Sequence, residues 1–296
     1  MATACRDALD EIDKKLKRYE DKGVLKLWQM QDADRLKMIR VEMQKTLNEL
    51  QGIIEIETTQ AIKTAYETAG MWTGYVVENT VGTANYTFAG INRYLLEASV
   101  SRKIAGLTVS DRLSAARLGL LWKERDAVAR AQLMGYGAEK TARQVILADV
   151  EASVKTSFSR AMMIGRTETT RNTTEATNAA NDDARGEGID TRLKWVSAHD
   201  ERTRLSHRKL DGTVAGHWSE ELGQYVFMVG GSPSAGPGHC AKLSDNVNCR
   251  CRAVTICVGY AEFYPSYESY YQWLDRAGKD PAHKALVEKV MKAEAA

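Results

Sequence analysis

The sequence has little of what would mark it as a secreted, membrane or dedicated nucleic-acid-binding protein. It lacks any uninterrupted apolar run of about 18 residues, so we expect no transmembrane helix. The stretch Met1 to Asp21 is charged throughout, so we expect no signal peptide. The net charge is only +2, whereas proteins dedicated to duplex nucleic acid usually carry a strong basic excess.

Cysteine and proline are also scarce. There are 5 cysteines, an odd number, and four of them lie between residues 240 and 257. This distribution fits a reducing cytoplasm better than a secreted disulfide framework. No proline occurs between residues 24 and 70, and Gly52 is the only glycine between residues 24 and 69.

The apolar residues that are present predict helices over the first half of the chain. They recur every three or four positions at Leu36, Ile39, Met43, Leu47, Leu50 and Ile54. We expect a helical hairpin or bundle arm broken near Gly52. The alternative is a single projecting helix of about 45 residues, roughly 67 Å long. Glycines at 70, 74, 82 and 90 then predict a loop or hinge over residues 70–90.

The second half of the chain mixes helices with short strands. Residues 138–161 and 164–186 read as two helices, the latter rich in Thr, Asn and Ala. Alternating patterns predict strands at 193–198 and 249–258, with a Gly/Pro-rich loop at 230–238. The expected fold class is α+β and predominantly helical: an elongated helical N-terminal region followed by a small α/β domain with a short sheet.

An ordered set of motifs follows residue 164. Its residues are Arg166 and Glu168 on a helix, Trp195, Asp200 and Arg202 at the end of a strand, Asp211 and Gly212 in a turn after His207, and Arg250 within Asn248-Cys249-Arg250-Cys251. In this order they resemble the phage Mu F-like head morphogenesis family, the minor capsid proteins of tailed phages. The resemblance implies three regions: an elongated helical region over 1–158, a Mu F-like domain over 159–258 and a tyrosine-rich tail over 259–296.

The same resemblance implies a structural protein rather than an enzyme. Its expected partners are the portal and major capsid proteins, with self-association and non-specific contact with packaged DNA left open, and no membrane. The expected location is the virion head, assembled in the host bacterial cytoplasm. We also expect no fused toxin-like enzyme domain after Val258. Two alternatives stay open: a nuclease-like metal-dependent enzyme, and an assembly factor that leaves before maturation.

Histidine and cysteine gather between His199 and Cys257, which makes zinc the one cofactor to consider. Zinc binds three or four nitrogen and sulfur ligands in a tetrahedron. The predicted set is His207, His239, Cys249 and Cys251, with Cys240 as the alternative to His239. Many members of the family have a cysteine where Arg204 stands and a histidine where Asn246 stands, which weakens the metal interpretation. Buried free cysteines on a core strand are the competing interpretation.

The remaining polar residues have structural interpretations beside functional ones. Asp200, His207 and Asp211 could form an acid–base site, but turn capping explains both aspartates. We expect Arg166 and Glu168 to act as a structural clamp, with Glu168 meeting Arg171 or Asn172. The basic run around Arg202 could contact phosphate, although a solvated turn explains it more simply. The tyrosines after Gly259 suggest anchors for another protein.

Overall fold

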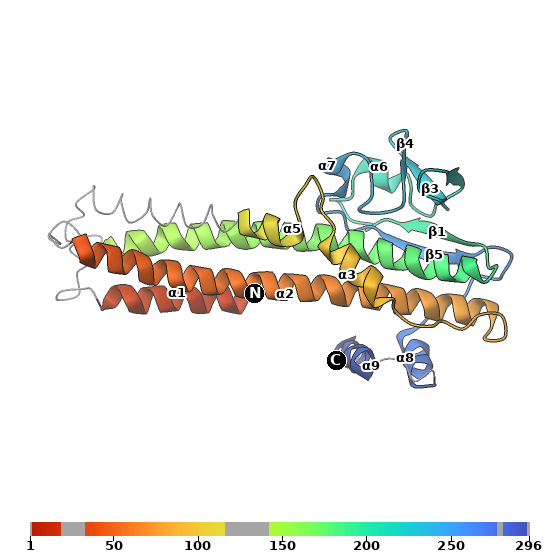
Figure 1. Cartoon of the computed structure of the whole chain (residues 1–296), viewed down its shortest axis with the longest axis horizontal. Coiled ribbons are helices and arrows are strands. Elements are labelled where there is room, and N and C mark those ends of the chain that lie inside the picture. Colours follow the sequence, from red (N-terminus) through yellow and green to blue (C-terminus); the bar gives the residue numbers. More distant parts are fainter. Residues whose placement is uncertain (1, 19–32, 116–141, 277–280, 295–296) are drawn as a thin grey trace. The chain divides into compact units, whose positions relative to one another are not determined.

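The fold is described from a computed structural model that covers residues 2–18, 33–115, 142–276 and 281–294 (Figure 1). The chain divides into two compact units. The first, here the helical unit, groups Met1–Gln60 with Lys103–Gly165; the second, here the mixed unit, groups Ala61–Arg102 with Arg166–Ala296. Helices α2 (Ala33–Val81) and α5 (Ala142–Gly186) each contribute to both units.

The helical unit is built from α1 (Ala2–Lys17), the first part of α2, a helical segment at 109–115 and the first part of α5. Its buried apolar residues follow helical spacing: Ile12, Leu16, Ile39, Met43, Leu47, Leu50, Ile54, Leu113, Ile146, Val150 and Val154. Two polar contacts add to this core. Lys15 Nζ donates to Thr46 Oγ1 at 2.8 Å, and Arg143 pairs with Asp13 at 2.6 Å.

Two expectations about α2 are wrong. The helix is not broken near Gly52, since it runs unbroken through 49 residues, about 74 Å at 1.5 Å per residue. The predicted loop at 70–90 begins only after Val81. At Gly70 and Gly74 other residues pack closely on the helix: a Cβ at Gly70 would lie 2.5 Å from Ile91 Cδ1, and one at Gly74 would overlap the Phe88 ring. These glycines allow Ile91 and Phe88 to pack closely on the helix, whereas the sequence analysis interpreted them as turn residues.

Helix α5 likewise joins two predicted helices into one of 45 residues. The division between the two units falls within this helix, after Gly165. Residues 61–102, by contrast, group with the C-terminal part of the chain. They include α3 (Arg93–Ser101), whose first turn is capped by the Asn92 side chain.

The mixed unit contains the predicted sheet and a second one that was not predicted. Strands β1 (Thr191–Val196) and β5 (Arg252–Cys257) pair antiparallel, with Trp195 opposite Ala253. The second sheet has the order β2 (His217–Ser219), β3 (Gln224–Val229), β4 (Ser232–Ser234). Part of the loop expected at 230–238 is therefore strand β4, which follows a tight turn at Gly230-Gly231. The short helices α6 (Leu205–Arg208) and α7 (Leu243–Asn246) lie in the connections.

The tyrosine-rich tail forms α8 (Tyr267–Arg276) and α9 (Pro281–Glu294). Tyr270 and Trp273 are buried, and their rings contact Tyr75 on α2. Trp273 Nε1 also donates to the buried Glu78 carboxylate at 2.9 Å. These aromatic residues are thus core of the mixed unit, whereas Tyr264 stays exposed. Over the residues that the structure covers, no helix combines the length and the apolarity that crossing a membrane requires.

Candidate functional site

The motif residues after β1 form a turn fixed by two aspartates. Asp200 Oδ1 accepts from Arg202 N at 3.1 Å and from Thr203 Oγ1 at 3.0 Å, and Asp200 also pairs with Arg250. Desolvation raises the pKa of Asp200, but these donors outweigh it and hold the pKa below its usual value. The turn-capping interpretation of Asp200 is therefore confirmed, and Arg250 is its partner.

Asp211 and Gly212 close the same turn onto β1. Ser197 N donates to Asp211 Oδ1 at 2.8 Å, which lowers the pKa of that carboxyl, and His199 Nε2 lies 3.3 Å from it. Gly212, at φ 72°, donates its N–H to the Trp195 carbonyl at 2.8 Å. Both aspartates are thus engaged in holding backbone, which favours the structural interpretation over an acid–base pair.

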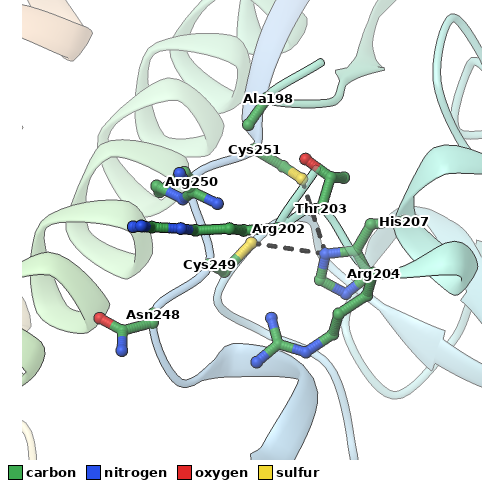
Figure 2. A pocket seen from close by; sticks show the side chains of 9 residues that line it. All are labelled: Ala198, Arg202, Thr203, Arg204, His207, Asn248, Cys249, Arg250 and Cys251. Atoms are coloured by element: carbon green, nitrogen blue, oxygen red, sulfur yellow. Dashed lines mark hydrogen bonds between the residues drawn. The ribbon is translucent and has the colours of Figure 1, made fainter. Parts of the chain in front are cut away.

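A thiol–imidazole cluster lies behind this turn. His207 Nδ1 is 3.6 Å from Cys249 Sγ and 3.5 Å from Cys251 Sγ (Figure 2), and all three residues are buried. The Trp195 ring packs edge-on against the His207 ring at 5.2 Å. The three ligand atoms lie within 4.8 Å of one another and could hold a metal ion.

The three groups of this cluster shift one another's pKa values. Burial lowers the pKa of His207, but the neighbouring thiols of Cys240 and Cys251 outweigh burial and raise this pKa to about 9. The hydrogen bond between the two thiols lowers the pKa of Cys251 and raises that of Cys249. The pair of thiols therefore favours one thiolate next to the imidazole.

The cluster opens into a small pocket rich in arginine. Its lining residues are Ala198, Arg202, Thr203, Arg204, His207, Asn248, Cys249, Arg250 and Cys251 (Figure 2). Arg204 donates to the Val247 carbonyl at 2.7 Å, whereas Arg202 is exposed. Sequence reasoning missed this pocket, because its residues come from two segments that are far apart in the chain.

The structure does not bring His239 to the cluster. His239 Nε2 lies 3.2 Å from the Arg171 carbonyl and 3.7 Å from Glu175, and burial lowers its pKa. Its neighbour Cys240 instead shares the apolar core of Cys249 and Cys251. The Asn246 side chain holds the Cys240 backbone through two hydrogen bonds of 2.8 and 2.7 Å. Of the two residues considered from this loop, Cys240 is the one near the cluster.

The predicted clamp on α5 involves Glu168 but not Arg166. Glu168 is fully buried and accepts two hydrogen bonds from Arg171, at 3.0 and 2.8 Å. Arg171 also pairs with Glu175 at 2.6 Å and donates to the Ser99 carbonyl at 3.0 Å. Arg166 is exposed. The sequence analysis named Arg171 as a partner of Glu168, but nothing in the sequence pointed to Glu175 or Ser99 as further partners of Arg171.

Comparisons with known proteins agree with the motif order. Residues 123–254 match the family model described as Phage Mu protein F like protein, which confirms the resemblance over that segment. The chain is 24% identical over 249 residues to minor head protein GP7 of Bacillus phage SPP1, covering 84% of this chain and 77% of that protein. It is also 24% identical over 286 residues to the NAD(+)–arginine ADP-ribosyltransferase EFV of Enterococcus faecalis, covering 90% of this chain. The chain spans only 55% of the length of that second relative. No solved structure matches the chain.

Proposed function

Because residues 123–254 match the model of the phage Mu protein F-like family, we propose that this chain is a minor structural component of a tailed-phage head. The observation that carries the proposal is the similarity to a minor head protein over 84% of this chain. That match extends well beyond the family segment, so it must include much of the N-terminal helical region as well. The proposed partners are the portal and major capsid proteins, met during head assembly in the host cytoplasm.

The first part of α2 offers a surface for such a partner. Four apolar side chains on it are exposed: Met38, Val41, Ile53 and Ile56, with Ile56 at 71%. At about 100° per residue, these positions fall within about 120° of the helix circumference, so they share one face. Lys45 and Glu49 lie between them on that face. Exposed apolar side chains suit a protein partner better than DNA, because contacts with DNA are made mostly by basic and polar side chains.

Quantitative mass spectrometry of purified particles tests the proposal. We expect this chain in DNA-filled virions at a fixed ratio, near or below that of the portal protein. If the chain is present in procapsids but absent from virions, it is an assembly factor that leaves the head before maturation. Absence from both would contradict a role in the head.

The α2 face is tested separately by co-purification from procapsids. The double variant Val41→Lys with Ile56→Lys should lower incorporation into heads at least tenfold while the purified chain stays folded. Leu222→Lys is the matched control, because Leu222 is also an exposed apolar side chain but lies in the turn after β2. Equal incorporation of both variants would exclude the α2 face as the contact.

Contact with packaged DNA forms a further part of the proposal. Arg202 and Lys209 are exposed in the turn after β1, where their charges can reach phosphate groups. Replacing both by alanine should reduce the slope of the logarithm of the DNA-binding constant against the logarithm of salt concentration by about 2. An unchanged slope would show that Arg202 and Lys209 face solvent and do not contact phosphate.

The similarity to an ADP-ribosyltransferase raises an enzymatic alternative. The match covers 55% of the length of the Enterococcus faecalis protein. We infer that the transferase activity named for that protein resides in its remaining part, outside the match. Purified chain incubated with NAD+ and an arginine substrate should therefore release no nicotinamide above the buffer rate. Turnover that is lost on heat denaturation would establish the enzymatic alternative.

A further inference from the structure

The two nitrogen–sulfur separations in the thiol–imidazole cluster match those that a tetrahedral metal ion imposes. Zinc–nitrogen bonds of about 2.0 Å and zinc–sulfur bonds of about 2.3 Å, at a tetrahedral angle, place the nitrogen about 3.5 Å from each sulfur. His207 Nδ1 lies 3.6 Å from Cys249 Sγ and 3.5 Å from Cys251 Sγ. From this geometry we propose that His207, Cys249 and Cys251 bind one Zn²⁺ ion, with its fourth position opening into the arginine-lined pocket.

Hydrogen bonding alone accounts less well for the arrangement. A single nitrogen, Nδ1, faces both sulfurs, and a ring N–H carries only one proton to donate. A metal ion accepts a lone pair from all three atoms at once. Two thiolates also balance the charge of a divalent ion while the imidazole stays neutral. No net charge would then be buried, whereas an isolated buried charge is costly.

The donor set also selects the metal. Thiolate and imidazole ligands favour zinc and related transition metals, while magnesium and calcium require oxygen donors. Of the residues around the pocket, Arg202, Arg204 and Arg250 carry only hydrogen-bond donors and cannot bind a cation. They can instead hold water or an anion at the fourth position.

The proposed ion would join segments that are distant in the sequence. His207 belongs to α6, while Cys249 and Cys251 lead into β5. Cys249 is also tied to α5, because Thr170 Oγ1 donates to its carbonyl at 2.6 Å. Zinc would therefore fix the motif turn, strand β5 and helix α5 against one another. This inference is independent of the proposed role in a phage head.

Metal titration of the full chain tests the site. Reduced, chelator-treated protein should take up one Zn²⁺ per chain, and its thermal midpoint should rise by about 5 °C or more with zinc at about 100 times the Kd. Co²⁺ in place of zinc should give the intense visible bands of a tetrahedral ion and charge-transfer absorption from two thiolates. A wild-type chain that takes up no stoichiometric zinc or cobalt would overturn the proposal, whatever the variants do.

Variants identify the ligands. His207→Ala and Cys251→Ser should weaken zinc binding at least tenfold. Cys257→Ser and His239→Gln are matched controls, since Cys257 is a buried thiol on β5 and His239 faces Arg171, and both should retain one ion. Zinc lost equally from controls and ligand variants would place the metal elsewhere. Charge transfer from a third thiolate that disappears in Cys240→Ser would overturn the open fourth position and assign it to Cys240.

Discussion

The two halves of α5 belong to one continuous helix but are buried in opposite ways. In the helical unit, the first half buries the apolar stripe Ile146, Val150 and Val154, with a step of four residues, beside the small polar residues Ser153 and Ser157. In the mixed unit, the second half buries mainly polar side chains: Glu168, Thr170, Arg171, Asn172, Thr174, Thr177 and Asn181. Apolar burial depends on area and tolerates changes of shape. Polar burial is favourable only where each group meets its own partner.

Some of those partners are backbone groups of the loops around the candidate site. Thr170 Oγ1 donates to the Cys249 carbonyl at 2.6 Å, and Thr174 Oγ1 donates to the Pro237 carbonyl at 2.8 Å. Gly238 approaches so closely that a Cβ would lie 2.8 Å from Arg171 Cα. The second half of α5 thus acts as a rigid support that positions irregular backbone. In the first half, the buried stripe depends on apolar character more than on individual partners.

The largest expected effect comes from breaking the buried ion pair of the second half. Glu168→Gln keeps the shape of the side chain but leaves Arg171 with one carboxylate fewer. Breaking a buried pair costs several kcal/mol, so we expect a loss of about 4 kcal/mol in the free energy of unfolding, measured by urea denaturation.

The matched control lies on the same helix. Glu151 forms an exposed i,i+4 pair with Lys155, at 2.7 Å. Glu151→Gln should cost less than about 0.5 kcal/mol, because exposed pairs contribute little. Similar losses for both variants would remove the distinction between the two halves.

Truncation of the apolar stripe should give the next largest effect. Ile146 is fully buried, so Ile146→Ala should cost about 3 kcal/mol through lost burial and the resulting cavity. Ile146→Val should cost only about 1 kcal/mol. A conservative substitution should therefore cost little stability in the first half of α5, as in Ile146→Val, but much in the second half, as in Glu168→Gln. A severe loss for Ile146→Val would show that the first half is as demanding as the second.

A single hydrogen bond to the loops should matter less, but its effect should be local. Thr170→Val preserves size and leaves the buried Cys249 carbonyl without its side-chain donor, for an expected cost of about 1 to 2 kcal/mol. Amide hydrogen exchange should accelerate in residues 248–251 more than in the first half of α5. Uniform acceleration along the chain would argue against a supporting role for this hydrogen bond.

The same contrast explains what could be predicted from the sequence. Ile39, Met43, Leu47 and Leu50 predicted helix α2 because spacing alone determines which face is buried. The turn at Asp211-Gly212 was predicted because its chemistry is local. The packing of Cys240 with Cys249 and Cys251, away from His239, depends on contacts between distant segments. No local pattern carries that information. Strand β4 was missed because Gly and Pro flank and occupy it, and those residues usually mark loops.

The smallest expected effect is a gain in stability on substitution of Gly52. It tests whether α2 is continuous at this residue, where the sequence wrongly predicted a break. Glycine in the middle of a helix costs about 0.5–1 kcal/mol relative to alanine, because its unfolded backbone has more freedom to lose. A Cβ at Gly52 would meet no atom within 4 Å, so nothing in the described structure opposes the substitution. Gly52→Ala should therefore stabilise the chain by up to about 1 kcal/mol in the same urea measurement. If α2 instead bends at this residue in solution, alanine would restrict the bend and the gain would disappear. A continuous helix and a hinged one thus predict different changes in the free energy of unfolding for Gly52→Ala. This substitution therefore distinguishes one continuous helix of 49 residues from two shorter helices.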